Sequence, residues 1–295
     1  MDKEGFAGNM NRNDLIKKIQ GGFQCNQVDL AGFDFSHANL AGADFRNANL
    51  SEADFSYCNL SGAKFQDSNL SSANFQHSVI AGATMVVARI SGIPLGNLNH
   101  TFFRSANLRN TDFSFAKIEK ADFVDADLKN STFENAYLRE CEFGRSNLAK
   151  VNLTNGEIQA CDFSRTSARL ISASKCSFLN CAFPQADMGG ADFLNCEFNN
   201  CIFKETSIAE SKFRHVRFTD CDFSDCHGIQ LEMVCNTFTR VLFEKALIEK
   251  SHWEDCTFLS SSFRLALLEG AVIRGTSKGA DFQGANGNFT TGDDK

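Results

Sequence analysis

An apolar residue returns at every fifth position along most of this 295-residue chain. The first register starts at Leu30 and holds to Ile90. A second register, three residues out of phase with the first, starts at Phe103 and holds through Ile273. A period of five fits neither the 3.6 residues of an α-helical turn nor the two-residue alternation of a strand. The pattern therefore predicts a solenoid with short, similar sides.

The other positions of the five-residue unit support this interpretation. Two residues before each apolar centre the chain prefers Ala, Ser, Thr or Cys, as at Ala38, Ala43 and Ala121. We expect this position to be interior but cramped, because only small side chains occupy it. The other three positions are mostly polar or Gly, which suits an exposed and turning backbone.

A longer period of twenty residues indicates how many sides each coil has. Nine successive positions at this spacing are all Phe, namely Phe103, Phe123, Phe143, Phe163, Phe183, Phe203, Phe223, Phe243 and Phe263. Only about half of the centres in this register are Phe. One side is therefore kept uniform from coil to coil, as a ladder of stacked aromatic rings requires.

The unit resembles the pentapeptide repeat family, whose consensus A(D/N)LXX is matched here by AGADF, RNANL, SEADF and GGADF. The resemblance covers about residues 25 to 275. It implies an all-β fold, a right-handed quadrilateral β-helix with one pentapeptide per side and four per coil. The Phe period of twenty supports four sides independently. For this length we expect about twelve coils.

We predict five segments along the chain. Residues 1–24 are an N-terminal tail and capping helix, and residues 25–95 are a first β-helix segment. Residues 96–102 are a phase-shift joint or loop, residues 103–275 are a second β-helix segment, and residues 276–295 are a flexible tail. Asn13 or Asp14 is the expected start of the helix, and Gly21 its end. Around the phase shift, Pro94, Gly96 and His100 form either a joint or a protruding loop. Since the shift is only three residues, we favour the joint.

Phe and Cys dominate the composition, with 30 Phe and 12 Cys against 2 Pro. Ten of the cysteines lie at the small interior position: Cys58, Cys141, Cys161, Cys176, Cys181, Cys196, Cys201, Cys221, Cys226 and Cys256. A metal or redox ladder is one interpretation, but no CxxC occurs and Cys exchanges with Ala, Ser and Thr. We favour packing as small buried hydrophobes, with Cys235 as the thiol most exposed to solvent.

Several classes of function are disfavoured. The net charge of −7 argues against binding nucleic acid through phosphate neutralisation. No apolar run is long enough to span a bilayer, and no secretory signal precedes the repeats, so we expect a cytoplasmic protein with reduced thiols. The six His are scattered, phosphate loops and nucleophile motifs are absent from the sequence, and a filled solenoid offers no cleft. We therefore expect no enzyme, no cofactor and no metal site.

Two features of the surface are candidate binding sites. Asp122, Glu142 and Asp162 recur at a period of twenty just before the Phe centres, so like charges stack, and Asp222 adds to the acidic character. Near the C-terminus, apolar residues occupy normally polar positions at Leu242, Leu247, Leu267 and Val272. An end-to-end homodimer is the simplest use of this patch, and cover by residues 276–295 is the alternative.

The second segment, with CEFGRSNL, CSFLNCAF and CEFNNCIF, is similar to the quinolone-resistance subgroup of the family. That resemblance implies a dimeric, acidic protein that imitates duplex DNA and binds a type II topoisomerase, DNA gyrase or topoisomerase IV. The acidic column would then stand in for phosphates, with no direct nucleic-acid or membrane binding. The alternative is a passive scaffold, a stress or immunity protein, or an effector module that binds another protein.

Overall fold

The computed structural model describes residues 11–70, 72–80, 83, 85, 89–90, 93–94, 98–287 and 290–291. The chain forms two compact units, unit 1 over residues 1–147 and unit 2 over residues 148–295. The elements of unit 1 are α1 (Arg12–Gln20), β1 (Arg89–Ile90), β2 (Ile93–Pro94), β3 (Lys117–Glu119) and β4 (Tyr137–Arg139). Those of unit 2 are β5 (Glu157–Gln159), β6 (Ser172–Ser174), β7 (Ser177–Leu179), β8 (Asp192–Leu194), β9 (Glu197–Asn199), β10 (Lys212–Arg214), β11 (Arg217–Thr219), β12 (Glu232–Val234), β13 (Thr237–Thr239), β14 (His252–Leu259), β15 (Val272–Lys278) and β16 (Thr290–Thr291).

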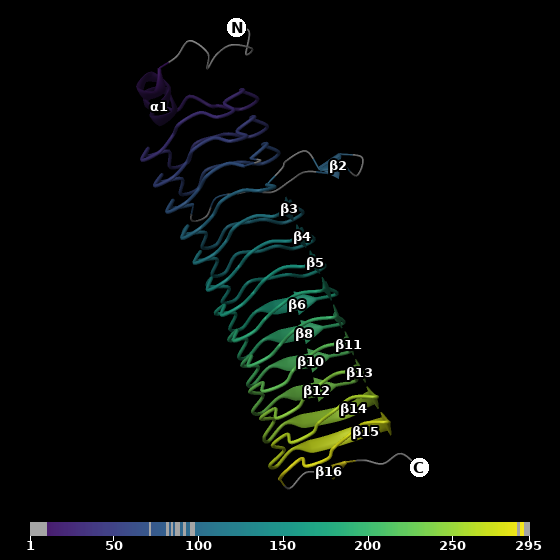
Figure 1. The fold of residues 1–295 in the computed structure, drawn as a ribbon. Coiled ribbons are helices and arrows are strands. Elements are labelled where there is room, and N and C mark those ends of the chain that lie inside the picture. The colour runs from purple at the N-terminus through teal and green to yellow at the C-terminus, as the bar shows by residue number, and fades with distance from the viewer. Residues whose placement is uncertain are drawn as a thin grey trace. The chain divides into compact units, whose positions relative to one another are not determined.

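Each unit is a parallel β-solenoid, as predicted (Figure 1). In unit 1, β3 pairs with β4 in parallel, with Lys117 opposite Tyr137. In unit 2, β7 and β9 pair with Ser177 opposite Glu197. Both pairings join residues twenty apart, so one coil of four sides separates hydrogen-bonded neighbours. This register confirms the four-sided coil.

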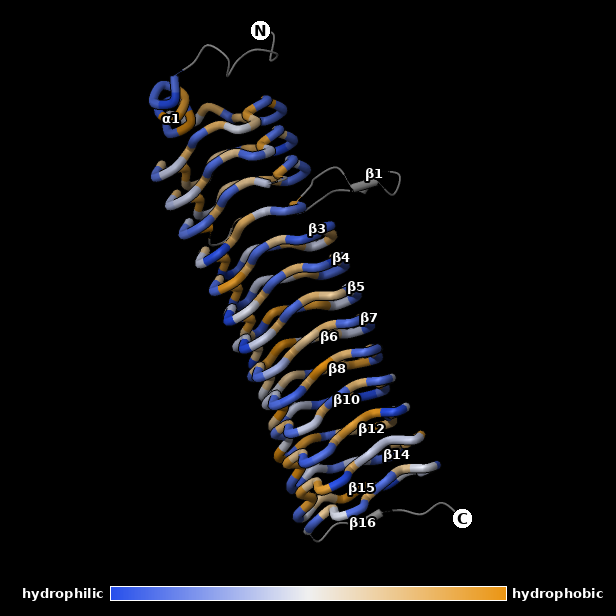
Figure 2. Tube along the Cα trace, viewed as in Figure 1, coloured by the Kyte–Doolittle hydropathy of each residue, from blue (hydrophilic) through white to orange (hydrophobic). Residues whose placement is uncertain are grey.

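We name the sides A to D by their interior residues. In unit 1, Phe35 and Phe103 lie on side A, Leu40 and Leu108 on side B, Phe45 and Phe113 on side C, and Leu50 and Ile118 on side D. In unit 2 the same spacing of twenty places Phe163, Ala168, Ala173 and Phe178 on sides A, B, C and D. Every one of these residues is buried. Interior apolar and exterior polar positions therefore alternate along each coil (Figure 2).

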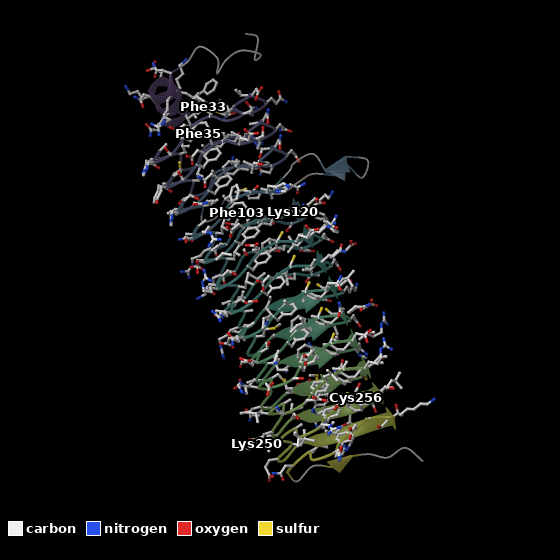
Figure 3. All side chains as sticks on the ribbon, viewed as in Figure 1. Phe33, Phe35, Phe103, Lys120, Lys250 and Cys256 are labelled. Carbon is white, nitrogen blue, oxygen red and sulfur yellow. The ribbon has the colours of Figure 1, made fainter. Side chains whose placement is uncertain are left out.

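The predicted Phe ladder of side A is confirmed within each unit. In unit 1, Phe103 and Phe123 stack with ring centroids 4.8 Å apart and an interplanar angle of 10°. In unit 2, Phe203 and Phe223 stack at 4.3 Å and 3°. Figure 3 shows the rings of Phe35 and Phe103 inside the coils of unit 1. Stacked pairs of this kind contribute roughly 0.5–1.5 kcal/mol beyond area burial.

The small interior position does more than fill space. The Cys201 thiol in unit 2 donates to the Phe178 carbonyl at 3.5 Å, and the Ser211 hydroxyl donates to the Met188 carbonyl at 2.9 Å. Both bonds reach back 23 residues to an interior residue of the preceding coil. Cys, Ser and Thr can therefore exchange at this position, because each supplies a small donor for a buried carbonyl.

The cysteines are free thiols, as expected. Eleven of the twelve are buried, and Cys235 alone is half-buried. Burial raises the pKa of the Cys256 thiol to about 12 and that of Cys58 to about 11. Since the thiolate is the reactive form, these side chains act as packing groups at neutral pH.

The phase shift in unit 1 has a different cause from the one we predicted. Phe75 stacks on Phe103 at 5.2 Å, and Val79 pairs with Asn107, so neighbouring coils here are 28 residues apart. The insertion is therefore eight residues, not three, and it lies between the buried Met85 and Leu98.

The insertion contains a hairpin in which Ile90 of β1 pairs antiparallel with Ile93 of β2. The backbone of Ile90 thus pairs within this hairpin and not with a neighbouring coil, which the five-residue register did not predict. Pro94 ends β2, which lies to one side of the coils of unit 1 (Figure 1), and Gly96 falls outside the described residues. His100 belongs to the next coil, where its backbone N–H donates to the Glu119 carbonyl at 2.8 Å.

Residues 276–287 form a further coil, where we expected a flexible tail. Phe282 stacks on Phe263 at 4.8 Å, and Asp281 pairs with Ser262. These partners are nineteen residues apart, and not twenty, because the coil is one residue shorter near Gly275. Gly275 lies so close to the preceding coil that a Cβ there would be 1.8 Å from the Cys256 carbonyl oxygen. Its φ of 152° is also unfavourable for other residues.

Helix α1 covers the open edge of the first coil, as predicted. Asn11 caps its start, rather than Asn13 or Asp14, by accepting from the Asp14 N–H at 2.9 Å, and Gly21 ends it. Arg12 donates from Nε to the Asp34 carbonyl at 3.0 Å, and Gln20 donates to the Asn39 carbonyl at 3.1 Å. The helix therefore satisfies carbonyls that a preceding coil would otherwise pair.

Candidate protein-binding surface

Within the described part of the chain, no group of three or more His, Cys, Asp or Glu residues could hold a metal ion. A hollow of about 600 Å³ beside α1 is lined mainly by polar groups, including Gln20, Asn39, Asp44 and Lys64. Asp44 is ion-paired to Arg46 at 2.7 Å, and the hydrogen bond from Arg46 holds the Asp44 pKa below its usual value. The Asp44 carboxylate is thus already neutralised by Arg46, so the hollow offers no free acidic group to a ligand. We therefore look for the candidate site on the outer faces of the coils.

Charge is distributed unevenly over the sides of unit 1. Side A carries five acidic residues (Asp34, Asp54, Asp122, Asp125 and Glu142) against two basic residues (Arg104 and Arg145). Side B of the same unit carries only Asp127 against Arg109 and Lys129. In unit 2, side A again has an acidic excess, with Asp162, Glu205, Asp222, Asp225, Glu244 and Asp281 against Arg165, Lys204, Lys245 and Arg264.

Part of this acidity is neutralised by ion pairs between coils. In unit 1, Asp122 pairs with Arg104 at 2.8 Å, and Asp125 accepts two hydrogen bonds from Arg145, each 2.8 Å. The hydrogen bonds from Arg145 lower the pKa of Asp125. Exposed pairs of this kind contribute little stability, but they reduce the field outside the protein.

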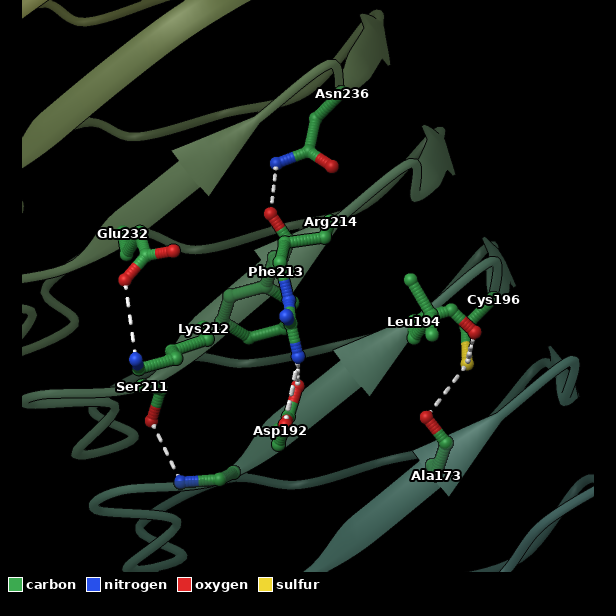
Figure 4. Close-up of polar contacts among 11 residues, drawn as sticks. Ala173, Asp192, Leu194, Cys196, Ser211, Lys212, Phe213, Arg214, Glu232 and Asn236 are labelled. Carbon is green, nitrogen blue, oxygen red and sulfur yellow. Dashed lines mark hydrogen bonds and ion pairs between the residues drawn. The ribbon is translucent and has the colours of Figure 1, made fainter.

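The same pairing recurs in unit 2 on side C. Asp192 binds Arg214 at 2.6 Å and Lys212 binds Glu232 at 3.3 Å, as the dashed lines in Figure 4 show. Figure 4 also shows the Cys196 thiol donating to the Ala173 carbonyl. The surface of unit 2 on this side is therefore a mixture of both charges.

The predicted acidic column is only partly continuous. Asp122 and Glu142 are direct neighbours on side A of unit 1, as the period of twenty predicts. In unit 2, Ala182 and Ile202 lie between Asp162 and Asp222 on side A. Each of these two carboxylates accepts from the backbone N–H two residues later, at 2.8 Å. Neither makes an ion pair with a basic side chain among the described residues.

The predicted apolar patch is also divided between sides of unit 2. Leu247 and Leu267 pair in adjacent coils on side B, which confirms that they stack. Leu242 lies on side A, while Val272 lies on side C opposite His252. Leu265, at the turn after side A, also belongs to the apolar cluster, and its side chain is 56% exposed, the largest fraction among the exposed apolar residues.

A column of exposed rings on unit 1 was not predicted as a site. His37 and Tyr57 stack with centroids 4.8 Å apart at 3°, and Tyr57 and His77 stack at 4.8 Å and 21°. All three have positive φ, at the corner that follows side A. The signal was available, because the three residues recur at twenty-residue intervals, but nothing in the repeat itself indicates that turn residues stack.

Family models for pentapeptide repeats match most of the chain. "Pentapeptide repeats (8 copies)" matches residues 24–56, 58–92, 96–130 and 126–165, and "Pentapeptide repeat region" matches residues 191–273. The chain belongs to the pentapeptide repeat family. This repeat protein matches no curated protein.

This pentapeptide repeat protein is similar to several solved structures at low sequence identity. One is HetL of the cyanobacterium Nostoc sp. strain PCC 7120, a protein involved in heterocyst differentiation regulation. It is 17% identical, with 94% of this chain and 95% of HetL covered and a TM-score of 0.40. Another is a trypsin-treated form of QnrB1, a plasmid-mediated fluoroquinolone resistance protein. It is 14% identical, with 59% of this chain and 92% of that chain covered and a TM-score of 0.31.

The pentapeptide repeat protein has one helix among its described residues, and α1 is only nine residues long. No helix in the described part is long and apolar enough to cross a membrane.

Proposed function

We propose that this pentapeptide repeat protein acts without catalysis, by binding a basic surface of a partner protein through side A. The observation that carries the proposal is the unequal charge of the sides. Side A of unit 1 has five acidic and two basic residues, while side B has one acidic and two basic residues. A side with a net excess of one charge attracts and orients an oppositely charged partner.

The acidic groups that remain unpaired are the ones available to a partner. Asp54 and Glu142 in unit 1, and Asp162 and Asp222 in unit 2, make no ion pair among the described residues. They lie at the outward position of side A. Backbone pairing with the neighbouring coils holds each of them in a fixed register. A partner with spaced basic groups would meet preorganised carboxylates, which lowers the entropy lost on binding.

For the partner we propose a type II topoisomerase, DNA gyrase or topoisomerase IV, whose DNA-binding surface must be basic to hold phosphates. Side A would then imitate part of the DNA backbone. The test is a gyrase supercoiling assay with and without ciprofloxacin, over a range of protein concentrations up to micromolar. Inhibition of supercoiling, or protection from the drug, supports this partner, while the absence of both rejects it.

A second candidate is a homodimer that acts as a scaffold through the apolar patch of unit 2. Leu265 and Leu242 are exposed, and Leu247 and Leu267 lie next to each other on side B. Light scattering should give twice the 32.5 kDa chain mass, and Leu247→Glu with Leu267→Glu should return the mass of one chain. A single-chain mass for the unaltered protein would reject the dimer.

A further inference from the structure

Phe102 is the one aromatic residue at the outward position of side A in unit 1. The other outward residues of this side are all polar, namely Asp34, Asp54, Asn74, Asp122 and Glu142. Thr101 and Phe103, next to Phe102 in the chain, are fully buried, so the Phe102 side chain faces away from the core, where it is 41% exposed. Packing of the solenoid therefore gives no reason for a large apolar residue here.

The backbone holds Phe102 in a fixed position between two coils. Its N–H donates to the Ala73 carbonyl of the preceding coil at 3.0 Å, and its carbonyl accepts from the Phe75 N–H at 2.7 Å. A Phe side chain has only two rotatable bonds. The ring is therefore preorganised, and enclosing it in a partner costs little conformational entropy.

The immediate neighbours of Phe102 carry no net charge. Its outward neighbours in the two adjacent coils are Asn74 and Asp122. Asn74 is uncharged, and the Asp122 carboxylate is neutralised by Arg104 at 2.8 Å. The exposed ring is thus the centre of a surface from which unpaired charge is absent.

Unpaired carboxylates lie one coil further out in both directions. Asp54 is the outward neighbour of Asn74, and Glu142 is the outward neighbour of Asp122. Neither makes an ion pair among the described residues. Each is two coils from Phe102, or roughly 10 Å at the usual spacing of paired strands. An apolar centre with charged groups at its rim is the arrangement of a binding hot spot.

We propose that Phe102 is the anchor of side A, and that the partner protein receives its ring in an apolar pocket flanked by two basic groups. Exposed carboxylates alone attract any basic surface, whereas an apolar anchor favours a protein that has a pocket at the matching place. This anchor rests on the proposed function, since it adds one apolar contact to the binding through side A.

The test uses the full chain and a model of such a pocket. β-Cyclodextrin has an apolar cavity that encloses a phenyl ring, and its derivative with an ammonium group on every glucose unit adds a basic rim. Both compounds are titrated by calorimetry at low salt. We expect the ammonium form to bind about ten-fold more tightly than the neutral form, because of the carboxylates of Asp54 and Glu142.

Three variants separate the ring from the charges. Phe102→Asn supplies a residue that is usual at this position, so it should remain folded, and it should weaken binding of the ammonium form by roughly ten- to thirty-fold. Asp54→Asn with Glu142→Gln should make the affinities of the two forms equal. Phe115→Asn is the matched control, because Phe115 is also 41% exposed but lies at the corner after side C. This control should bind as the unaltered protein does.

Equal binding of the ammonium form by the unaltered protein and by Phe102→Asn would overturn the inference, as would equal affinity of the unaltered protein for both forms. Thermal unfolding shows whether each variant is folded. In the gyrase assay, an unchanged effect of Phe102→Asn would reject the anchor and leave the proposed partner standing. If the unaltered protein has no effect on gyrase, that partner is rejected, while the cyclodextrin titration still decides on the anchor.

Discussion

Replacing Ala168 by Val should stabilise unit 2. Ala168 is the interior residue of side B between Leu148 and Met188, and Ala173 is the interior residue of side C in the same coil. Two small residues in one coil leave the interior underfilled. A cavity of about 10 Å³ results, lined by Ala168 and by apolar residues such as Phe178 and Phe193.

The magnitude follows from the size of the cavity. A space of this kind holds roughly one water-sized sphere, so it can receive about one of the two methyl groups that Val adds, while small shifts of the lining must accommodate the other. At about 0.8 kcal/mol per buried methylene group, the free energy of unfolding should rise by about 0.8 kcal/mol. For a unit of 148 residues this corresponds to an increase in Tm of roughly 2–3 °C.

Thermal and urea unfolding of the full chain measure the effect, with Ala168→Phe as the control. The six additional carbon atoms of Phe exceed the cavity, so this variant should lose about 1–3 kcal/mol through overpacking. If Ala168→Val is less stable than the unaltered protein, the cavity is not available to a larger side chain and the packing argument is wrong.

Three further changes test other contacts. Arg12→Ala should uncover carbonyls at the edge of the first coil, so we expect concentration-dependent association of the protein by light scattering, against Lys18→Ala as an exposed control on the same helix. Gly275→Ala introduces a Cβ 1.8 Å from the Cys256 carbonyl oxygen, and hydrogen exchange should show loss of protection in residues 276–287. Cys201→Ser should be nearly neutral because a hydroxyl can make the same bond. Cys201→Ala should cost about 1–2 kcal/mol, and equal Tm values for the two variants would refute the hydrogen-bonding role.

Most of the fold could be predicted because the repeat constrains it at two levels. The period of five identified interior positions, and the Phe period of twenty gave the number of sides per coil. The ladder in which Phe203 stacks on Phe223 follows directly from that spacing. Ten cysteines were correctly placed at the small interior position, but their bonds to carbonyls of the preceding coil depend on three-dimensional geometry that the pattern does not contain.

The errors also have a physical origin. An insertion of eight residues and one of three give the same phase shift in a five-residue register, so the spacing alone could not distinguish them. Only the pairing of Phe75 with Phe103 shows the difference. Near the C-terminus, the coil is one residue shorter at Gly275, which moves Phe282 out of the five-residue register. The sequence therefore predicted a tail where the structure has a further coil.

The candidate site was less predictable than the fold. The period of twenty correctly made Asp122 and Glu142 neighbours. It could not show that Arg104 neutralises Asp122. These residues are eighteen apart, off the period of twenty, and their ion pair depends on the side-chain conformation of Arg104. The ring column of His37, Tyr57 and His77 likewise depends on how turn residues project from the corner.

The most direct test of the account compares two sets of four neutralised carboxylates in the gyrase supercoiling assay. One set is on side A, with Asp54→Asn, Glu142→Gln, Asp162→Asn and Asp222→Asn. The matched set is on sides C and D, with Asp112→Asn, Glu134→Gln, Glu157→Gln and Asp255→Asn. Each set removes two charges from each unit. The account predicts that the side A set abolishes the effect on gyrase while the matched set retains it. Equal effects of the two sets would contradict the claim that side A binds the partner.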